Sequence, residues 1–142
     1  MSAYKKIECT ITDKESLLAA LDFLELEYSE YEDPQNLKGY MNDIRKDLAN
    51  IIISKESLNL KYTGASNDIG FLWNDSEQKY EFICSEYDKR KNMDARIIQA
   101  YAKIVIEKAL EKNGYKTTVS ITDDFSKRRA LEDIEIVAKK LI

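Results

Sequence analysis

The fold is decided by the stretch IGFLWNDSEQKYEFIC, residues 69–84. Large apolar side chains occupy alternate positions on both sides of a polar loop at residues 74–78: Ile69, Phe71 and Trp73 before it, and Tyr80, Phe82 and Cys84 after it. Alternation with a period of two is typical of a half-buried strand. The stretch therefore predicts two antiparallel strands with one aromatic face.

The chain begins with a predicted strand and helix. Residues 7–11 alternate between apolar and polar side chains, which indicates a strand. The spacing of Thr12 and Glu15 is that of a capping box, so we expect a helix to open there and to end near Leu26.

The segment between this helix and the hairpin is harder to assign. Residues 51–53 and 58–62 have strand patterns. Residues 35–50 place apolar side chains at helical spacing, although Gly39 inside the pattern costs about 1 kcal/mol relative to Ala in a helix. We expect a short helix over residues 35–50 and leave a strand open as the alternative.

A long helix and two strands follow the hairpin. The helix is predicted to begin after Asn92 and to end before Gly114, which stands at the position where helices favour glycine. Apolar alternation predicts strands at residues 119–121 and 134–138, joined by a loop at 122–131 with room for a helical turn.

Together these elements predict an α+β fold. It has a single antiparallel-dominated sheet of five to six strands, with two to three helices on one face. The 142 residues contain no repeat, linker or low-complexity tract, so residues 1–142 are expected to form a single domain.

The composition excludes several chemistries. The sequence has no histidine and two cysteines, which excludes Ser-His-Asp and Cys-His catalytic sites, His-ligated zinc and a disulfide framework. Cys9 and Cys84 fall at apolar positions of strands, where a free thiol packs as a small hydrophobe. A net charge of -4 argues against extended nucleic acid as a partner, and the basic runs at 89–91 and 127–129 are expected to be solvated turns.

No motif for a cofactor, a metal or a phosphate loop is present. The four glycines are too scattered for a nucleotide fingerprint, and no acidic run has the calcium-loop spacing. Asp123 with Asp124, and Asp68 with Glu81, are the nearest approach to an acid–base pair, which leaves a carboxylate hydrolase as a minor alternative. We expect that the protein is not an enzyme.

Aromatic side chains are the strongest signal for binding. Adjacent predicted strands carry a row of rings that forms either a ligand groove or the core: Phe71, Trp73, Tyr80 and Phe82. An irregular segment before the sheet adds Tyr28, Tyr31 and Tyr40. Tyrosine offers a flat face and a hydroxyl group, which suits a ligand with a base or another planar group.

Several segments resemble one known family. They are the opening MSAYKKIECTITD with Leu17, Leu21 and Leu24 after it, the pair Gly39-Tyr40, DIGFLWN at 68–74, and QAYAKIVIEKALEKNGY at 99–115. In this order they resemble the hypothetical chloroplast reading frame 35 family, a domain of unknown function of plastids, cyanobacteria, other bacteria and some phages. DIGF followed by tryptophan is the most specific segment.

The resemblance implies a cytoplasmic α+β protein, in bacteria sometimes encoded near an AAA+-type ATPase, and it supplies no established reaction. Family members often carry histidines where this chain has Ala3 and Ile104. A metal or proton-transfer role that rests on those histidines therefore does not carry over. Asp68, Trp73 and Tyr101 match the family pattern and are the leading site candidates.

We therefore expect a non-catalytic binding protein that holds a small nucleotide-like ligand in an aromatic-lined groove, as a phage-type sponge of a signalling nucleotide would. The candidate ligand-binding residues are Asp68, Trp73, Tyr101, Tyr40, Tyr80, Tyr28 and Tyr31. The alternative is a protein-interaction adaptor, for example of an AAA+-type ATPase, which predicts an exposed apolar patch and no enclosed pocket. Both hypotheses leave self-association open, and neither involves a membrane, a metal or a cofactor. The absence of a membrane span or an apolar secretory signal also predicts a cytoplasmic location.

Overall fold

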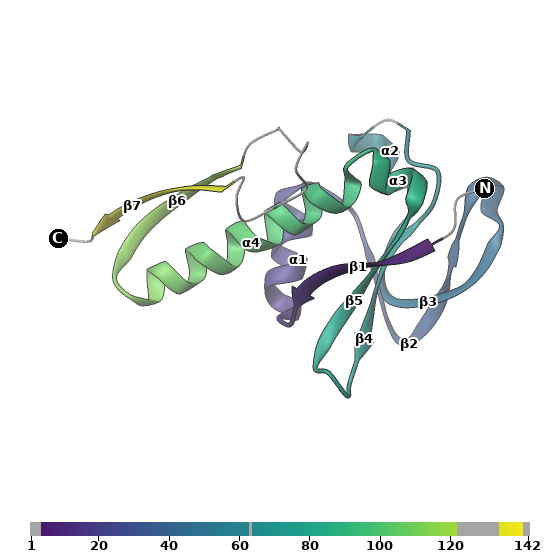
Figure 1. Ribbon diagram of the computed structural model, residues 1–142, viewed down its shortest axis with the longest axis horizontal. Coiled ribbons are helices and arrows are strands. Elements are labelled where there is room, and N and C mark those ends of the chain that lie inside the picture. The colour runs from purple at the N-terminus through teal and green to yellow at the C-terminus, as the bar shows by residue number, and fades with distance from the viewer. Residues whose placement is uncertain (1–3, 63, 122–133, 141–142) are drawn as a thin grey trace.

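The computed structural model describes residues 4–62, 64–121 and 134–140 (Figure 1). Its helices and strands follow in this order: β1 (Tyr4–Ile11), α1 (Lys14–Phe23), β2 (Ser29–Lys38), the 3-10 helix η1 (Tyr40–Asn42), β3 (Ile44–Ile53), α2 (Lys55–Lys61), β4 (Ile69–Asn74), β5 (Lys79–Ser85), α3 (Glu86–Arg90), α4 (Met93–Lys112), β6 (Tyr115–Ile121) and β7 (Ile134–Lys140).

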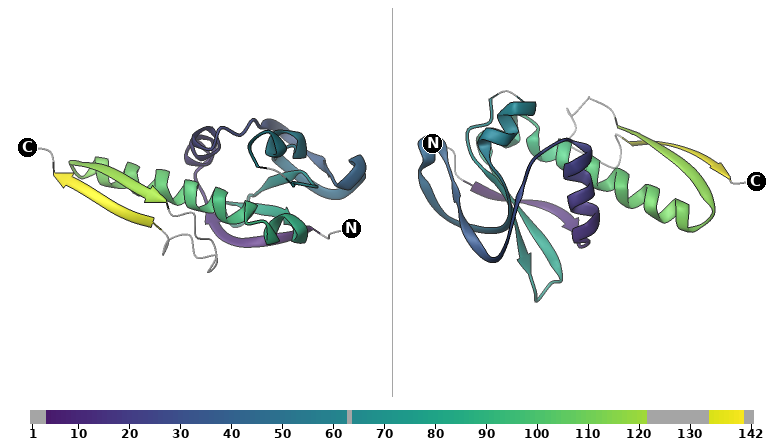
Figure 2. Two further views of the ribbon diagram at one scale, coloured as in Figure 1. Left: turned by 90° about the horizontal axis from the view of Figure 1, so that it is seen from above. Right: turned by 180° about the vertical axis from the view of Figure 1, so that it is seen from behind.

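Strands β1 to β5 form one antiparallel sheet in the order β1-β5-β4-β3-β2. The hairpin predicted at residues 69–84 supplies two of its inner strands, with Phe71 opposite Phe82 and Trp73 opposite Tyr80. The predicted α+β class and antiparallel sheet are confirmed. The last two predicted strands, β6 and β7, pair with each other in a separate sheet alongside the far half of α4 (Figures 1 and 2).

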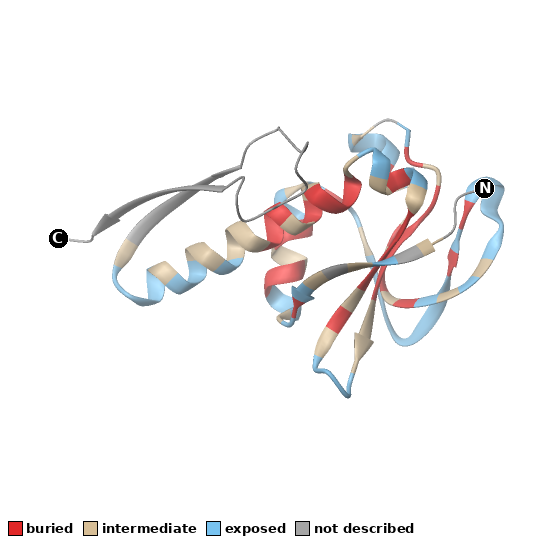
Figure 3. Cartoon of the chain, in the orientation of Figure 1, coloured by how far each residue is buried: buried red, intermediate tan, exposed pale blue. Residues whose placement is uncertain are grey.

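The main core lies between one face of the five-stranded sheet and helices α1 and α4. Phe71 and Phe82 are fully buried there, with ring centroids 4.6 Å apart. Leu17 and Leu21 of α1 and Ile97 of α4 belong to the same cluster, and each such side chain stabilises the fold by about 1.5–3 kcal/mol when buried. Figure 3 shows the buried residues gathered where these helices meet the sheet.

A smaller cluster lies on the opposite face, where the β2–β3 hairpin curls over the sheet (Figure 1). Leu37 of β2 and Ala49 of β3 pack there with Ile83. They approach β4 so closely that a Cβ on Gly70 would lie 2.5 Å from the Ala49 Cβ and 2.8 Å from Leu37 Cδ2. Glycine at this position of β4 therefore allows the hairpin to fold back.

Residues 35–50 are strand rather than the predicted helix. They form the end of β2, the η1 turn and the first part of β3, with Asn36 opposite Leu48. The helical spacing is misleading because Met41 and Ile44 are 80% and 71% exposed instead of buried. The long β3 strand is fixed by its pairing with β4 through residues 51–53, a tertiary contact that overrides local spacing.

The strand predicted at residues 58–62 is also wrong, because residues 58–61 belong to α2. Ser54 is the N-cap of this helix, and its Oγ accepts a hydrogen bond from Ser57 N. Leu58 is buried, but Leu60 is 84% exposed. A serine cap therefore outweighs an alternation whose middle apolar side chain, Leu60, does not reach the core.

The start of α1 differs from the prediction by one residue. Asp13 is the N-cap instead of Thr12, and its carboxylate accepts hydrogen bonds from Glu15 N and Ser16 Oγ. The helix ends at Phe23, three residues before the expected end.

The long helix α4 begins after Asn92 and ends before Gly114, as predicted. Asn92 is left-handed and makes no side-chain cap, while Gly114 has the expected positive φ of 82°. The short helix α3 was not expected. The predicted loop at 122–131 and the basic run at 127–129 lie outside the described residues.

Candidate functional site

Large apolar side chains are exposed at the end of the β2–β3 hairpin, residues 39–44, which we call the hairpin tip. Tyr40, Met41 and Ile44 are 56%, 80% and 71% exposed. Met41 and Asn42 have left-handed backbones, with φ of 56° and 62°. This conformation costs an L-residue roughly 1–2 kcal/mol and persists where the surrounding structure fixes it.

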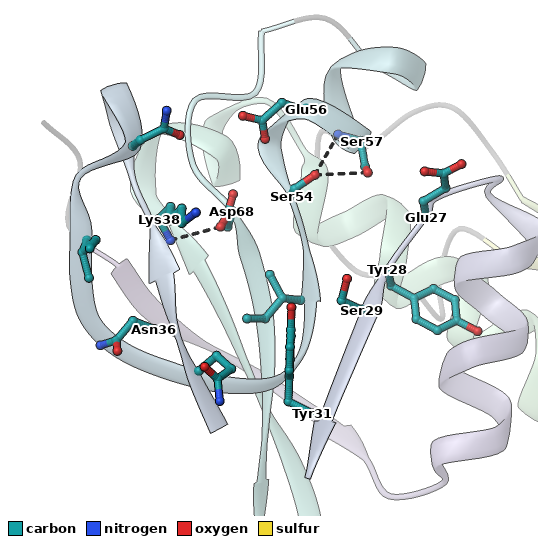
Figure 4. A pocket seen from close by; sticks show the side chains of 14 residues that line it. Glu27, Tyr28, Ser29, Tyr31, Asn36, Lys38, Ser54, Glu56, Ser57 and Asp68 are labelled. Carbon is teal, nitrogen blue, oxygen red and sulfur yellow. Dashed lines mark hydrogen bonds between the residues drawn. The ribbon is translucent and has the colours of Figure 1, made fainter. Parts of the chain in front are cut away.

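Asp68 is the principal residue that fixes the hairpin tip. It is 6% exposed, and its carboxylate accepts hydrogen bonds from Lys38 N and Lys55 N, each at 3.0 Å. Its own backbone N–H donates to Lys38 O at 2.9 Å. One side chain thereby ties the end of β2 to the start of α2, and Figure 4 shows its hydrogen bond with Lys38.

Tyr4 of β1 reaches the same place. Its hydroxyl donates to Asp68 O at 2.8 Å and contacts Lys38 O at 3.2 Å. Burial raises the pKa of this phenol well above its usual range, and the Asp68 carboxylate raises it further. Tyr4 is therefore a neutral hydrogen-bond donor throughout the ordinary pH range.

Lys55 and Gly39 fix the turn itself. Lys55 Nζ donates to Asn42 Oδ1 at 2.6 Å and to Gly39 O at 3.3 Å. A Cβ on Gly39 would lie 2.9 Å from Arg45 Nη1, so glycine permits this close packing. The hairpin tip is thus held by side chains from β1, α2 and the loop before β4.

A buried polar network positions the loop that carries Asp68. The Asp88 carboxylate accepts hydrogen bonds from Ser85 Oγ at 2.8 Å and from Ser66 N at 3.1 Å. Asn67 Nδ2 donates to Ser85 Oγ at 3.0 Å. Because Asp88 and Ser85 are fully buried, these hydrogen bonds fix the loop firmly.

The curl of the hairpin surrounds a polar hollow of about 550 Å³ that is open to solvent (Figure 4). The side chain of Tyr31 stands inside it, with Tyr28 on one side and Lys38 and Asp68 on the other. Most of the remaining lining is also polar, including Asn36, Ser54, Glu56 and Ser57.

A second hollow, of about 350 Å³, lies on the other side of Tyr31 and is called the aromatic hollow here; it is lined by Lys14, Glu30, Tyr31, Glu32, Asn50, Ile51, Trp73 and Tyr80. The Trp73 and Tyr80 rings meet edge to face, with centroids 4.9 Å apart. Lys14 Nζ forms an ion pair with Glu30 at 2.8 Å. Burial raises the pKa of Tyr80, so its hydroxyl stays protonated beside this pair.

Asn50 joins the strands that form the aromatic hollow. Its Oδ1 accepts a hydrogen bond from Trp73 N at 3.0 Å, and its Nδ2 donates to the backbone oxygens of Tyr31 and Glu32, each at 3.1 Å. The hydrogen bonds of the Asn50 side chain therefore fix the backbone of the two strands that carry the Trp73 and Tyr31 rings.

The structure brings most of the predicted site residues together. Five of them line the two hollows that share Tyr31: Tyr28, Tyr31, Asp68, Trp73 and Tyr80. Tyr40 lies on the hairpin tip, apart from both linings. In the predicted row of strand aromatics, Phe71 and Phe82 are fully buried in the core. Tyr80 is also a core residue, and it lines a hollow together with Trp73, which packs against the core.

Tyr101 lies elsewhere and has a different partner. It is 8% exposed, and its hydroxyl accepts hydrogen bonds from Thr12 N and Asp13 N, each at 3.2 Å. These backbone groups precede α1, so Tyr101 of α4 anchors the start of that helix.

The proposed carboxylate pairs do not form a shared site among the described residues. Asp68 binds backbone N–H groups, whereas Glu81 pairs with Lys6 at 2.6 Å and lines a different hollow. Asp123 and Asp124 lie outside the described residues. Within the described part of the chain, no group of three or more carboxylates or thiols is placed to hold a metal ion.

Sequence reasoning missed four residues of this site. Tyr4 and Lys55 hold the hairpin tip, and Met41 and Ile44 are its exposed apolar side chains. The available signal was Gly39 inside an otherwise helical apolar pattern, followed by the polar pair Asn42-Asp43. Such a glycine with two turn-forming residues is typical of a hairpin turn.

Comparison with known proteins identifies a family whose function is unknown. A family model described as "Protein of unknown function (DUF1257)" matches residues 20–127. No curated protein and no solved structure matches the chain. In the described residues, no helix is both long and apolar enough to cross a membrane.

Proposed function

Because the chain belongs to the DUF1257 family of proteins of unknown function, we propose a function from its own geometry: it is a non-catalytic protein-interaction module that inserts the hairpin tip into an apolar hollow of a partner protein. The observation that carries this proposal is an exposed, strained apolar turn held by three other segments of the chain.

The energetics of the hairpin tip favour binding. Transfer of Met41 and Ile44 from water into a partner would contribute about 1.5–3 kcal/mol for each side chain. Asp68, Lys55 and Tyr4 fix the turn before any partner arrives. The tip therefore loses little conformational entropy on binding, which is the advantage of a pre-organised contact.

The resemblance to the hypothetical chloroplast reading frame 35 family suggests a class of partner. Bacterial genes of that family sometimes lie near a gene for an AAA+-type ATPase, so we propose an adaptor of such an ATPase in the cytoplasm. A phage-encoded member could use the same surface on a host ATPase.

Quantitative co-purification from cells, followed by a Kd measurement with the purified partner, tests the proposal. We expect Met41→Ser to weaken binding at least about tenfold, the effect of removing a central apolar contact. Leu60→Ser is the matched control, because Leu60 is an 84% exposed apolar residue on α2, outside the tip. Equal binding by the wild type and Met41→Ser would refute the proposal.

The aromatic hollow favours a second function, the binding of a small planar ligand such as a nucleotide. Tyr31, Trp73 and Tyr80 come together there with one lysine, Lys14. Tyr31 and the partly buried Trp73 offer stacking faces on rigid strands, whereas Tyr80 is 7% exposed and belongs to the core. A sponge that sequesters a signalling nucleotide needs no catalytic group.

The single tryptophan reports directly on this second function. We expect nucleotides to quench Trp73 fluorescence in a saturable way and to raise the Tm. Tyr31→Ala should weaken the quenching, whereas Tyr40→Ala, which removes an exposed tyrosine of the hairpin tip outside this lining, should not. Absence of Trp73 quenching across a nucleotide panel, whether or not the Tm changes, would leave the interaction module as the function.

A further inference from the structure

A further hollow, of about 380 Å³, is lined by Lys61, Tyr62, Lys91, Met93 and Arg96, and we call it the basic hollow. These residues come from the end of α2, the turn after α3 and the start of α4. None of them lines the polar hollow or the aromatic hollow, and none belongs to the hairpin tip.

The lining of the basic hollow carries three cations and no carboxylate. This is unlike the rest of a chain whose net charge is -4. Two acids stand nearby: Glu25 pairs with Lys61 at 2.7 Å but is 74% exposed, and Asp94 is buried with partners of its own. A hollow lined by charge of one sign concentrates the field and attracts ions of the opposite sign.

Two of the cations are placed by aromatic rings. The Arg96 guanidinium lies 4.7 Å from the centroid of the Tyr62 ring, and Lys91 Nζ lies 5.4 Å from that of Tyr87. Lys91 also lies across Gly64, where an added Cβ would be 2.9 Å from Nζ. These contacts hold the charges around the hollow before a ligand binds.

We infer that the basic hollow binds the phosphate group of a small ligand. The two ammonium groups can donate charge-assisted hydrogen bonds to one phosphate, and Arg96, which has partners of its own, adds a positive charge beside them. The Tyr62 ring and the buried Met93 supply an apolar wall for the organic part of the ligand. A phosphate monoester or diphosphate of moderate size fits this chemistry.

Calorimetric titration of the full chain with inorganic pyrophosphate, AMP and adenosine tests the inference. We expect pyrophosphate and AMP to bind and adenosine not to bind. Lys91→Gln and Lys61→Gln should each weaken pyrophosphate binding roughly tenfold, the effect of losing one charge-assisted hydrogen bond. Arg90→Gln is the matched control, because it removes the same charge from the neighbouring exposed residue that does not line the hollow.

Glu25→Gln provides a gain-of-binding test. It releases Lys61 from its ion pair without changing the lining, so pyrophosphate should bind more tightly than to the wild type. No binding of pyrophosphate, or an equal loss of pyrophosphate binding for Arg90→Gln and Lys91→Gln, would each overturn the inference, as would adenosine binding as tight as that of AMP without quenching of Trp73. Pyrophosphate has no ring to stack in the aromatic hollow, so its titration tests this inference separately from either proposed function, and binding of AMP or adenosine that quenches Trp73 is assigned to the aromatic hollow instead.

Discussion

Asp68 is a single buried residue that joins three segments of the chain. Its replacement should therefore destabilise the fold. Asp68→Ala would leave the N–H groups of Lys38 and Lys55 without their acceptor. An unpaired buried donor costs about 1–3 kcal/mol, so we expect the free energy of unfolding to fall by at least that amount. Urea denaturation measures it, with Asp33→Ala on exposed β2 as the control. A change of less than about 0.5 kcal/mol, typical of surface substitutions, would contradict this role.

Cys9 gives a prediction about pH. Burial raises the pKa of its thiol to about 11, and Asp94 adds to the increase while Lys79 opposes it. The thiol should therefore react slowly with a disulfide reagent near pH 8, and its rate should climb well beyond about pH 9, where an ordinary cysteine levels off. Cys9→Ser should remove this slow reaction, because Cys84 is fully buried. A rate that levels off near the ordinary thiol pKa would contradict the shift.

The same shift has a consequence for stability. The folded pKa of Cys9 lies above the value of about 8.5 for an unfolded chain. The folded state therefore favours the protonated thiol, and this contribution is fully present below about pH 8.5 and is lost as the pH rises towards 11. Cys9→Ser should be less sensitive than the wild type to pH in this window.

At the scale of elements, sequence patterns predicted best where burial decides the structure. Large apolar side chains recur at alternate positions of β4 and β5 because that face of the strands packs in the core, as Phe71 and Phe82 do. The β2–β3 hairpin has a helical apolar pattern without being a helix, because Met41 and Ile44, which the pattern would bury, are exposed. Predictions from local sequence patterns are expected to fail most often at functional sites. The segment where the helix prediction fails, residues 35–50, contains the hairpin tip, which is the candidate interaction surface.

The fold-back of the hairpin over β4 can be tested with a pair of substitutions. Gly70→Ala places a Cβ within 2.5 Å of the Ala49 Cβ, so either the hairpin or β4 must shift. Overpacking of this kind costs about 1–3 kcal/mol, measurable by urea denaturation. Ala49→Gly should restore part of that loss in the double variant, although it destabilises the wild type. Additive losses would show that the two residues do not oppose each other across this contact.

At the scale of the molecule, the candidate sites are formed by residues far apart in the sequence. Alternation predicted that Trp73 and Tyr80 would be neighbours, and family resemblance selected Asp68. Neither could show that Asp68 meets Lys55, because that contact depends on the helix α2, which the sequence pattern assigned to a strand. The basic hollow is similar: Lys91 was expected to be a solvated turn residue, and its proximity to Lys61 follows from the packed fold alone.

The hairpin tip, the aromatic hollow and the basic hollow have no lining residue in common, so they should respond separately to substitution. Met41→Gly is the sharpest variant, because glycine adopts the observed φ of 56° without strain. We expect it to raise the free energy of unfolding by up to about 1 kcal/mol, less the entropy that glycine gains in the unfolded chain. It should also remove the apolar contact that a partner would bury.

Four measurements on Met41→Gly check this: urea denaturation, partner Kd, Trp73 quenching and pyrophosphate titration. Stability should be retained or increased while partner binding falls, with quenching and pyrophosphate affinity as in the wild type. A stable variant that binds less well would mean that Met41 is retained at the turn for recognition and not for folding. If Met41→Gly instead unfolds more readily and binds its partner normally, the left-handed turn serves the fold, and the hairpin tip is not the interaction surface.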